Sequence, residues 1–269
     1  MLNYQTVNNG NGQFGYVKLG SGTETLIMLV GYSGNLLHWN SELINKLAEY
    51  YTVYLLDNRL VGLSYSSNDE TISGFADDVA DFIRILNLKQ CKVFGWSMGG
   101  IIAQSLAIKY PYLLNGLILM VSQPDYTYTY GELHSVVREL RHNPNKQNRD
   151  RLMELFYSEE PSIEFRKYLA KNTLRIDGYI YPFSNEAQLL QDKAVSSYVA
   201  DFLKIEQINI PTAIFTSIND KVTKTEASYI LHKLIKSSKL ISYSTGGHFF
   251  MNYNAQQVAN DLIGFFENS

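Results

Sequence analysis

Short apolar runs recur along the chain, and most are followed by segments with helical periodicity. The runs comprise residues 26–30, 53–56, 93–94, 117–121, 213–215 and 240–243. An unbroken apolar run is typical of a strand that is buried on both faces, as in a parallel sheet. Apolar residues recur at helical spacing in segments 71–87, 98–110, 225–236 and 254–267. This alternation predicts βαβ units, so we expect an α/β fold with a mostly parallel central sheet of about eight strands flanked by helices.

Two segments depart from this alternation. Residues 1–20 surround the turn residues 8–12, which predicts an antiparallel hairpin at the edge of the sheet. Residues 123–195 contain short amphipathic pieces and no convincing strand. They also carry tyrosines at positions 126, 128, 130, 157, 168, 179 and 181.

Residues 123–195 are called the cap segment below. We expect it to form a helical cap, or lid, over a core made of residues 1–122 and 196–269, because the loops that follow parallel strands build the sites of α/β sheets. The alternative is a set of extra surface helices with no part in binding.

The composition excludes several classes of protein. The chain has 269 residues, with 23 Lys+Arg against 26 Asp+Glu, so we expect no nucleic-acid partner. A single cysteine, Cys91, excludes an intrachain disulfide and a thiolate metal cluster. No apolar run approaches the ~20 residues that cross a bilayer. The start of the chain lacks the features of a signal peptide. We therefore expect a cytoplasmic protein with a small-molecule partner and no membrane partner; the oligomeric state stays open.

One glycine motif is better explained as a turn than as a cofactor site. Residues 10–15 match G-x-G-x-x-G. A dinucleotide site needs a buried strand before this motif and a helix after it. Here the preceding residues are mostly polar, and the following residues alternate like a strand. We therefore expect no dinucleotide cofactor.

A second motif carries candidate chemistry. Gly95-Trp96-Ser97-Met98-Gly99 follows a predicted strand and precedes the helical segment 98–110, which is G-x-S-x-G in a strand–turn–helix context. A serine on such a turn lies above the carboxyl edge of the sheet. The N-terminus of the helix there offers N–H groups to an oxyanion. The motif predicts that Ser97 is a nucleophile; the alternative is a Gly/Ser turn that only lets the helix pack on the sheet.

A serine nucleophile needs a base and an orienting acid. His248 follows a predicted strand and precedes a predicted helix, which places it at the same sheet edge as Ser97. Asp220 follows the strand around 212–217 and precedes another helix. The order Ser97, Asp220, His248 is the chain order of nucleophile-elbow hydrolases, so we predict that Asp220 is the acid. Asp125, just after an earlier strand, is the rival.

The other titratable candidates are weaker. His134, His142 and His232 lie on polar helix faces, where we expect solvation. His38 lies at the start of a helix and could at most line the site. Asp57 is a third carboxylate at this sheet edge. We expect it to be structural if the nearby arginine at position 59 is its partner.

Several segments resemble the α/β-hydrolase fold superfamily, specifically its compact members with a single cap. They are the elbow 95–100, the proline-led strand and acid turn 210–220, the histidine loop 247–249, and residues 57–64, which are similar to the family's D-x-R-G-x-G-x-S loop. The resemblance covers roughly residues 1–122 and 196–267 but not the cap segment. Residues 30–34 depart from it, because the family often has His-Gly there.

The resemblance implies an oxyanion hole beside Ser97. One backbone N–H comes from the residue after the nucleophile, Met98, and the other from the loop after Val30. We assign this second donor to Tyr32. As candidates for the substrate pocket we add Trp96, which adjoins the nucleophile, and three cap-segment tyrosines, which can offer ring faces or hydroxyls. These tyrosines are Tyr126, Tyr128 and Tyr130.

Together these features predict a serine hydrolase for a small to medium carboxylic ester, lactone or related carbonyl compound. The chemistry would run through a Ser-His-Asp triad and an acyl-enzyme, with no cofactor and no metal. A C–C bond hydrolase, a thioesterase, or an acyltransferase or lyase on the same triad stays open. So does a ligand-binding protein on a hydrolase fold with slow or no turnover.

Overall fold

A ten-stranded sheet forms the centre of the molecule in the computed structural model, which describes residues 1–180 and 184–269, without the side chain of residue 141. The main strands are β1 Leu2–Asn8, β2 Gly12–Leu19, β3 Glu24–Leu29, β4 Tyr51–Leu56, β6 Cys91–Trp96, β7 Leu114–Met120, β9 Thr212–Ser217 and β10 Ser238–Tyr243. They lie in the order β10-β9-β7-β6-β3-β4-β2-β1, and the pairs from β10 to β4 are parallel. The predicted α/β fold is therefore confirmed.

The amino-terminal hairpin is present, but two short strands were not expected. β1 and β2 pair antiparallel, and β2 also runs antiparallel to β4. The two-residue strands β5 (Tyr65–Ser66) and β8 (Ile176–Asp177) bring the sheet from eight strands to ten. β8 lies in the cap segment, where we expected no strand, and it adds to the free edge of β1. Such a pairing comes from tertiary contact and leaves no periodicity in the sequence.

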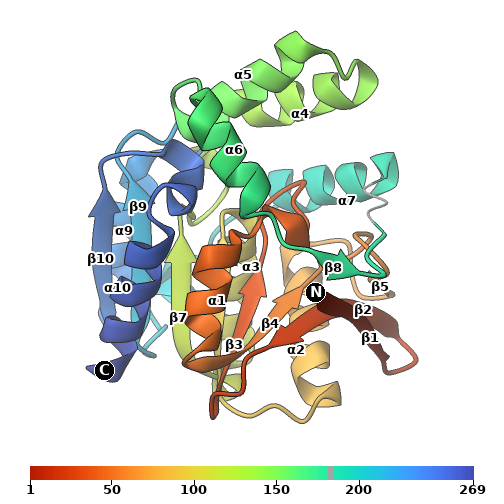
Figure 1. The fold of residues 1–269 in the computed structure, drawn as a ribbon. Helices are drawn as coiled ribbons and strands as arrows, with labels where there is room; N and C mark the ends of the chain where they lie inside the picture. Colours follow the sequence, from red (N-terminus) through yellow and green to blue (C-terminus); the bar gives the residue numbers. More distant parts are fainter. Residues whose placement is uncertain (181–183) are drawn as a thin grey trace.

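Helices cover both faces of the sheet (Figure 1). The core helices are α1 Ser41–Ala48, α2 Ile72–Ile85, α3 Met98–Lys109, α8 Phe202–Ile205, α9 Thr225–Leu234 and α10 Ala255–Glu267. One buried apolar cluster joins α2 and α3 to one face, and another joins α1 and α10 to the opposite face. The strands between them are apolar on both sides for this reason. In the described part of the chain, no helix combines the length and the apolarity needed to cross a membrane.

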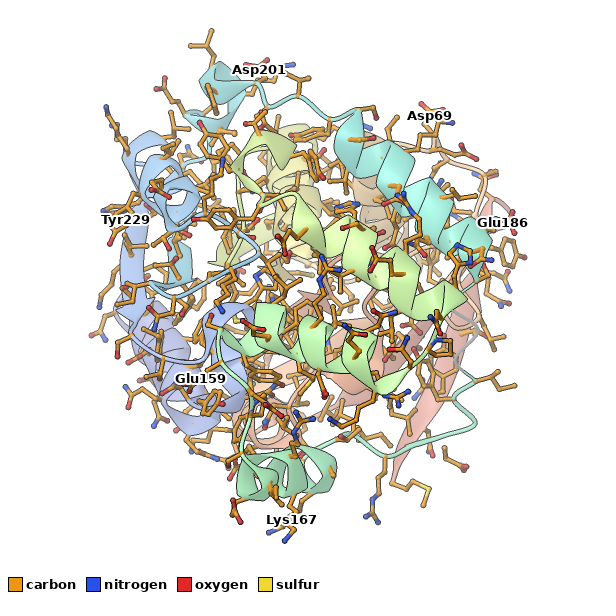
Figure 2. The ribbon with its side chains drawn as sticks, turned by 90° about the horizontal axis from the view of Figure 1, so that it is seen from above. Asp69, Glu159, Lys167, Glu186, Asp201 and Tyr229 are labelled. Atoms are coloured by element: carbon orange, nitrogen blue, oxygen red, sulfur yellow. The ribbon has the colours of Figure 1, made fainter. Side chains whose placement is uncertain are left out.

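The cap segment lies over the carboxyl ends of the parallel strands (Figure 1). Its helices are α4 Glu132–His142, α5 Lys146–Tyr157, α6 Ile163–Lys171 and α7 Asn185–Ser196. Seen from above, α4, α5 and α7 extend across this end of the molecule (Figure 2). A small apolar cluster from α4 and α5 packs against Val222, in the loop after β9. The cap segment therefore closes the sheet edge at which the predicted catalytic residues emerge.

Candidate active site

Ser97 lies on a sharp turn between β6 and α3. Its backbone has a positive φ of 56° with a ψ of −119°, a combination that non-glycine residues rarely adopt, and its side chain does not cap the helix that follows. Glycines on either side allow this turn, because a Cβ on Gly95 would lie 2.3 Å from the Gly99 carbonyl oxygen. A Cβ on Gly99 would in turn lie 2.3 Å from the carbonyl oxygen of Leu29, on the neighbouring strand. The residue thus sits in strained backbone at the N-terminus of α3, as expected for a nucleophile elbow.

His248 and Asp220 form a buried pair at the same sheet edge. His248 lies in the 3₁₀ helix Gly247–Asn252 after β10, and its Nδ1 is 2.8 Å from Asp220 Oδ2. The other carboxylate oxygen of Asp220 accepts hydrogen bonds from the backbone N–H groups of Val222 and Thr223, at 2.7 and 3.0 Å. The side chains of His248 and Asp220 are only 3% and 2% exposed. The pair fixes the imidazole ring and leaves its Nε2 for the cavity side.

The rival acid, Asp125, does not contact His248. It caps the 3₁₀ helix Tyr126–Tyr128, where its Oδ1 accepts from the backbone N–H of Thr127 at 3.0 Å. Its Oδ2 accepts from the backbone N–H of Ala200 at 3.3 Å. This carboxylate therefore stabilises local backbone.

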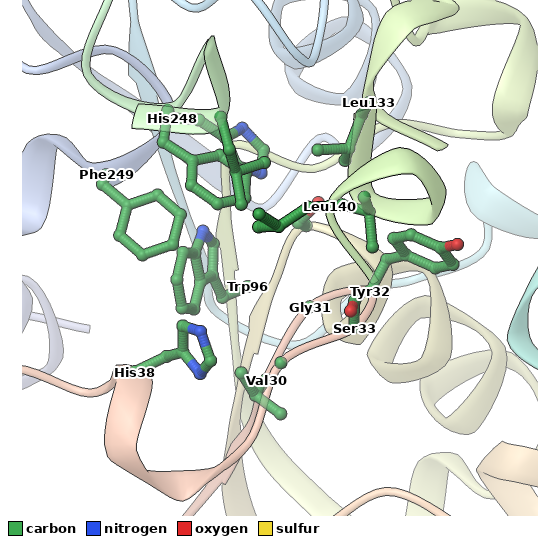
Figure 3. A pocket seen from close by; sticks show the side chains of 15 residues that line it. Val30, Gly31, Tyr32, Ser33, His38, Trp96, Leu133, Leu140, His248 and Phe249 are labelled. Atoms are coloured by element: carbon green, nitrogen blue, oxygen red, sulfur yellow. The ribbon is translucent and has the colours of Figure 1, made fainter. Parts of the chain in front are cut away.

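Ser97 and His248 both line a cavity of about 370 Å³ beneath the cap segment. Figure 3 shows His248 in the wall of this cavity. The core contributes Val30, Gly31, Tyr32, Ser33, Gly34, His38, Trp96 and Phe249 to its lining. The cap segment contributes Leu133, Val137 and Leu140 from α4, and Leu152 and Phe156 from α5. Among these described lining residues there is no lysine, arginine, aspartate or glutamate. The cavity therefore suits an apolar, uncharged compound.

Trp96 lies in the wall of this cavity. Its ring is edge-on to Phe249, at 4.5 Å between centroids, and 6.2 Å from the ring of His248. It is 3% exposed, so it mainly packs beside the histidine.

The three predicted cap-segment tyrosines do not line the cavity, so this expectation is corrected. Backbone hydrogen bonds tie Tyr128 and Tyr130 to the loop after β9, through Lys224 N–H and Val222 C=O at 2.8 and 2.7 Å. Tyr126 packs edge-on against His134 instead. Leucine, valine and phenylalanine side chains of α4 and α5 line this side of the cavity instead. The helical spacing of these residues was visible in the sequence, but the face they cover was not. Tyr181 lies outside the described residues.

The loop after β3 approaches Ser97 closely. A Cβ on Gly31 would lie 2.9 Å from Ser97 Cβ, so only glycine fits between this loop and the elbow. Tyr32 follows at once, and both Tyr32 and Met98 border a small space next to Ser97. The loop and the elbow therefore meet directly beside the Ser97 side chain.

Side chains of the cap segment hold this loop from outside. The hydroxyl of Tyr32 donates to Asp192 Oδ1 at 2.7 Å, and the backbone N–H of Ser33 donates to Gln191 Oε1 at 2.8 Å. His134 stacks on the Tyr32 ring with 4.1 Å between centroids, and its Nδ1 lies 2.6 Å from the same Asp192 oxygen. We expected His134 to be solvated, but its side chain is 14% exposed and burial lowers its pKa. The sequence does not indicate this burial, because it comes from a contact between His134 on α4 and Asp192 on α7.

Asp57 is structural, but for a different reason from the one expected. The Arg59 guanidinium pairs with Asp78, with Nε 2.9 Å from Oδ2. Asp57 instead accepts hydrogen bonds from the hydroxyls of Tyr4 and Tyr179, at 2.8 and 3.0 Å. Burial without a cationic partner raises the pKa of Asp57 to about 7.

No cluster of three or more His, Cys, Asp or Glu side chains that could hold a metal ion occurs in the described residues.

Comparisons with known proteins agree with this architecture. The family model of the alpha/beta hydrolase fold matches residues 24–255. The chain therefore belongs to the alpha/beta hydrolase fold family. Its fold is also similar to that of an alpha/beta hydrolase fold protein from Chitinophaga pinensis, with a TM-score of 0.83 and 21% identity over 100% of this chain and 98% of the other.

Two curated proteins illustrate the similarity in sequence. The chain is 23% identical over 244 residues to a putative carbamate hydrolase RutD from Serratia proteamaculans (strain 568), and the match covers 90% of both chains. It is 30% identical over 106 residues to the pimeloyl-(acyl-carrier protein) methyl ester esterase of Wigglesworthia glossinidia brevipalpis. That second match spans only 39% of each chain.

Proposed function

We propose that this protein is a serine hydrolase that cleaves a small to medium, uncharged carboxylic ester, lactone or related carbonyl compound. The observation that carries the proposal is the buried His248–Asp220 pair, whose histidine lines the same cavity as Ser97 at its strained turn. A serine, an imidazole and a carboxylate in these roles constitute a triad whatever their fold.

In the proposed reaction, the Ser97 hydroxyl attacks the carbonyl carbon and His248 Nε2 takes its proton. The negative charge that develops on the carbonyl oxygen is met by the backbone N–H groups of Tyr32 and Met98. Each such donor is worth roughly 10²–10³ in kcat in comparable sites. His248 then gives the proton to the leaving alcohol, and an acyl-enzyme forms on Ser97. Water, activated by the same imidazole, releases the acid. Asp220 keeps Nδ1 of His248 protonated throughout.

The cavity supports the proposed substrate class. Its described lining carries no lysine, arginine, aspartate or glutamate, and the cap segment provides only apolar groups there. Relatives named as a carbamate hydrolase and a methyl ester esterase support acyl transfer to water as the reaction class. A thioesterase, a C–C bond hydrolase or an acyltransferase uses the same residues. A ligand-binding protein on this fold is the alternative from another class.

Labelling with a fluorophosphonate probe, combined with turnover of a generic 4-nitrophenyl ester, tests the proposal. Labelling with turnover is expected for a hydrolase, and both should vanish in Ser97→Ala. Ser105→Ala removes the same hydroxyl from a buried serine further along α3 and serves as the matched control, which should keep both. Labelling without turnover would indicate a transferase or a binding protein. Absence of both in the wild type would refute the proposed function.

A further inference from the structure

His38 is a polar side chain in an otherwise apolar part of the cavity wall, and the mechanism above does not use it. It ends the 3₁₀ helix Leu36–His38 that follows the β3 loop. The side chain of Asn35 accepts from the backbone N–H of Leu37 at 2.8 Å, and the backbone N–H of Asn35 lies 3.1 Å from His38 Nδ1. This reciprocal arrangement is a capping box in which histidine occupies the position usual for Glu or Gln.

The capping box determines which ring nitrogen carries the proton. A backbone N–H can only donate, so the N–H of Asn35 requires a lone pair on His38 Nδ1. The carbonyl oxygen of Asn35, which would favour the opposite tautomer, is more distant from Nδ1, at 3.3 Å. Burial lowers the pKa of His38, so the ring is neutral near pH 7. The proton of the neutral ring is therefore on Nε2.

Nε2 of His38 has no hydrogen-bond partner in the described part of the chain. The residue keeps a partly exposed surface, and that surface faces the cavity. Figure 3 shows the ring projecting into the cavity next to Trp96, with Phe249 close by. The Phe249 and His38 rings are 6.3 Å apart, so the surroundings of Nε2 are largely aromatic. Water in the cavity can reach this donor, and a ligand that displaces the water must offer an acceptor or leave the N–H unpaired at a cost in free energy.

We propose that His38 Nε2–H donates a hydrogen bond to the substrate, at an oxygen other than the reacting carbonyl. The inference rests on the proposed function, because it takes the cavity as the substrate site. It narrows the substrate class to esters or lactones with a second, neutral acceptor, such as a ketone, ether or hydroxyl oxygen. A neutral imidazole in a cavity without charged side chains suits a neutral acceptor. His38 is thus a specificity-determining residue.

An oxygen scan of the substrate tests this assignment. In 4-nitrophenyl esters, an oxygen replaces one methylene at a time along a hexanoyl chain. A second series moves the oxygen along the alcohol of an alkyl ester. To correct for differences in intrinsic reactivity, kcat/KM of each ester is divided by the rate constant of its alkaline hydrolysis. The wild type is expected to favour the oxygen at one position by about 3–10-fold, the worth of one neutral hydrogen bond.

Two variants separate the donor from the fold. His38→Phe keeps a ring of similar size without a donor, so the preference should disappear. His38→Gln should restore it, because Oε1 can accept from the Asn35 N–H while the amide NH₂ faces the cavity. The rate of fluorophosphonate labelling at Ser97 in each variant reports whether the rest of the site is intact.

The outcomes are distinct. A wild type that hydrolyses the plain esters but favours no oxygen position in either series overturns the inference, even if no variant folds. A preference that persists in His38→Phe overturns it as well. A wild type that hydrolyses no ester refutes the proposed function itself, and the assignment of His38 falls with it.

Discussion

The Asp220→Asn substitution replaces one carboxylate oxygen by an amide NH₂ at nearly constant size. In the wild type, one carboxylate oxygen accepts from two backbone N–H groups, of Val222 and Thr223, and the other contacts His248. The asparagine has a single oxygen to place. It will face the two N–H groups, because the flipped amide would lose two hydrogen bonds, each worth about 1 kcal/mol, and would set NH₂ against N–H.

This orientation of the amide changes the tautomer of His248. The amide NH₂ faces Nδ1 of His248 across the 2.8 Å contact, so Nδ1 must accept and the ring proton moves to Nε2. Nε2 is the nitrogen that we assign as the base, and in this tautomer it has no lone pair for the Ser97 proton. We expect kcat to fall by ~10⁴, as when the orienting aspartate of a serine triad is amidated, which corresponds to about 5.5 kcal/mol.

Steady-state hydrolysis of 4-nitrophenyl butyrate measures this loss. Asp125→Asn is the matched control, because Asp125 lies at the same sheet edge but caps backbone and does not contact His248. It should change kcat by no more than a few-fold. If folded Asp220→Asn lost less than about tenfold in kcat, or if Asp125→Asn suffered the large loss, the assignment of the acid would be wrong.

Three further predictions concern the parts of the molecule around the triad. Burial raises the pKa of Asp57 to about 7 from an ordinary 3.8, so the folded state binds the carboxyl proton more tightly than the unfolded state does. The stabilisation that this proton gives the folded state is lost as the pH rises through 7. The free energy of unfolding of the wild type, measured with urea, should therefore fall by about 2–3 kcal/mol between pH 5 and 8, and that of Asp57→Asn should not. The same pH dependence in both proteins would contradict this assignment. Asp192→Asn should loosen the Tyr32 loop and lower kcat about tenfold with little change in KM. The control Asp150→Asn, at a half-buried aspartate on α5 that does not contact this loop, should leave kcat unchanged. An unchanged kcat in Asp192→Asn would show that Asp192 does not position the loop. In a series of 4-nitrophenyl esters, kcat/KM should peak at acyl chains of about two to eight carbons, because each buried CH₂ gains only ~0.8 kcal/mol and a cavity of about 370 Å³ is soon filled. A maximum at lipid-like chains would require a longer groove.

The sequence was most informative where function depends on local backbone. The strand, turn and helix around Ser97 lie within a few consecutive residues, so the pattern of glycines and apolar positions was sufficient to predict the elbow. His248 and Asp220 follow strands that parallel pairing brings to the same edge, and chain order favoured Asp220 over Asp125 as the acid. The structure pairs Asp220 with His248. The α/β fold followed from the apolar runs for the same local reason.

Features that depend on contacts between distant segments were not predictable in this way. The cap-segment tyrosines are abundant, yet none of the described ones lines the cavity, and apolar side chains of α4 and α5 line it instead. Two of these tyrosines, Tyr128 and Tyr130, pair through their backbone with the β9–α9 loop. Asp57 takes two tyrosines from the N-terminal strand and the cap segment as partners, while the neighbouring Arg59 reaches Asp78. The two tyrosine partners of Asp57 lie 53 and 122 residues away along the chain, so no local pattern indicates them.

The central claim is that Ser97 forms an acyl-enzyme with a carbonyl substrate. Acid quenching of the wild type during turnover of 4-nitrophenyl acetate, followed by mass spectrometry of the digested protein, detects such an intermediate directly. We expect one added acetyl group on the peptide that contains Ser97, and no such adduct in Ser97→Ala. An acetyl group found on another residue, with turnover retained in Ser97→Ala, would contradict it.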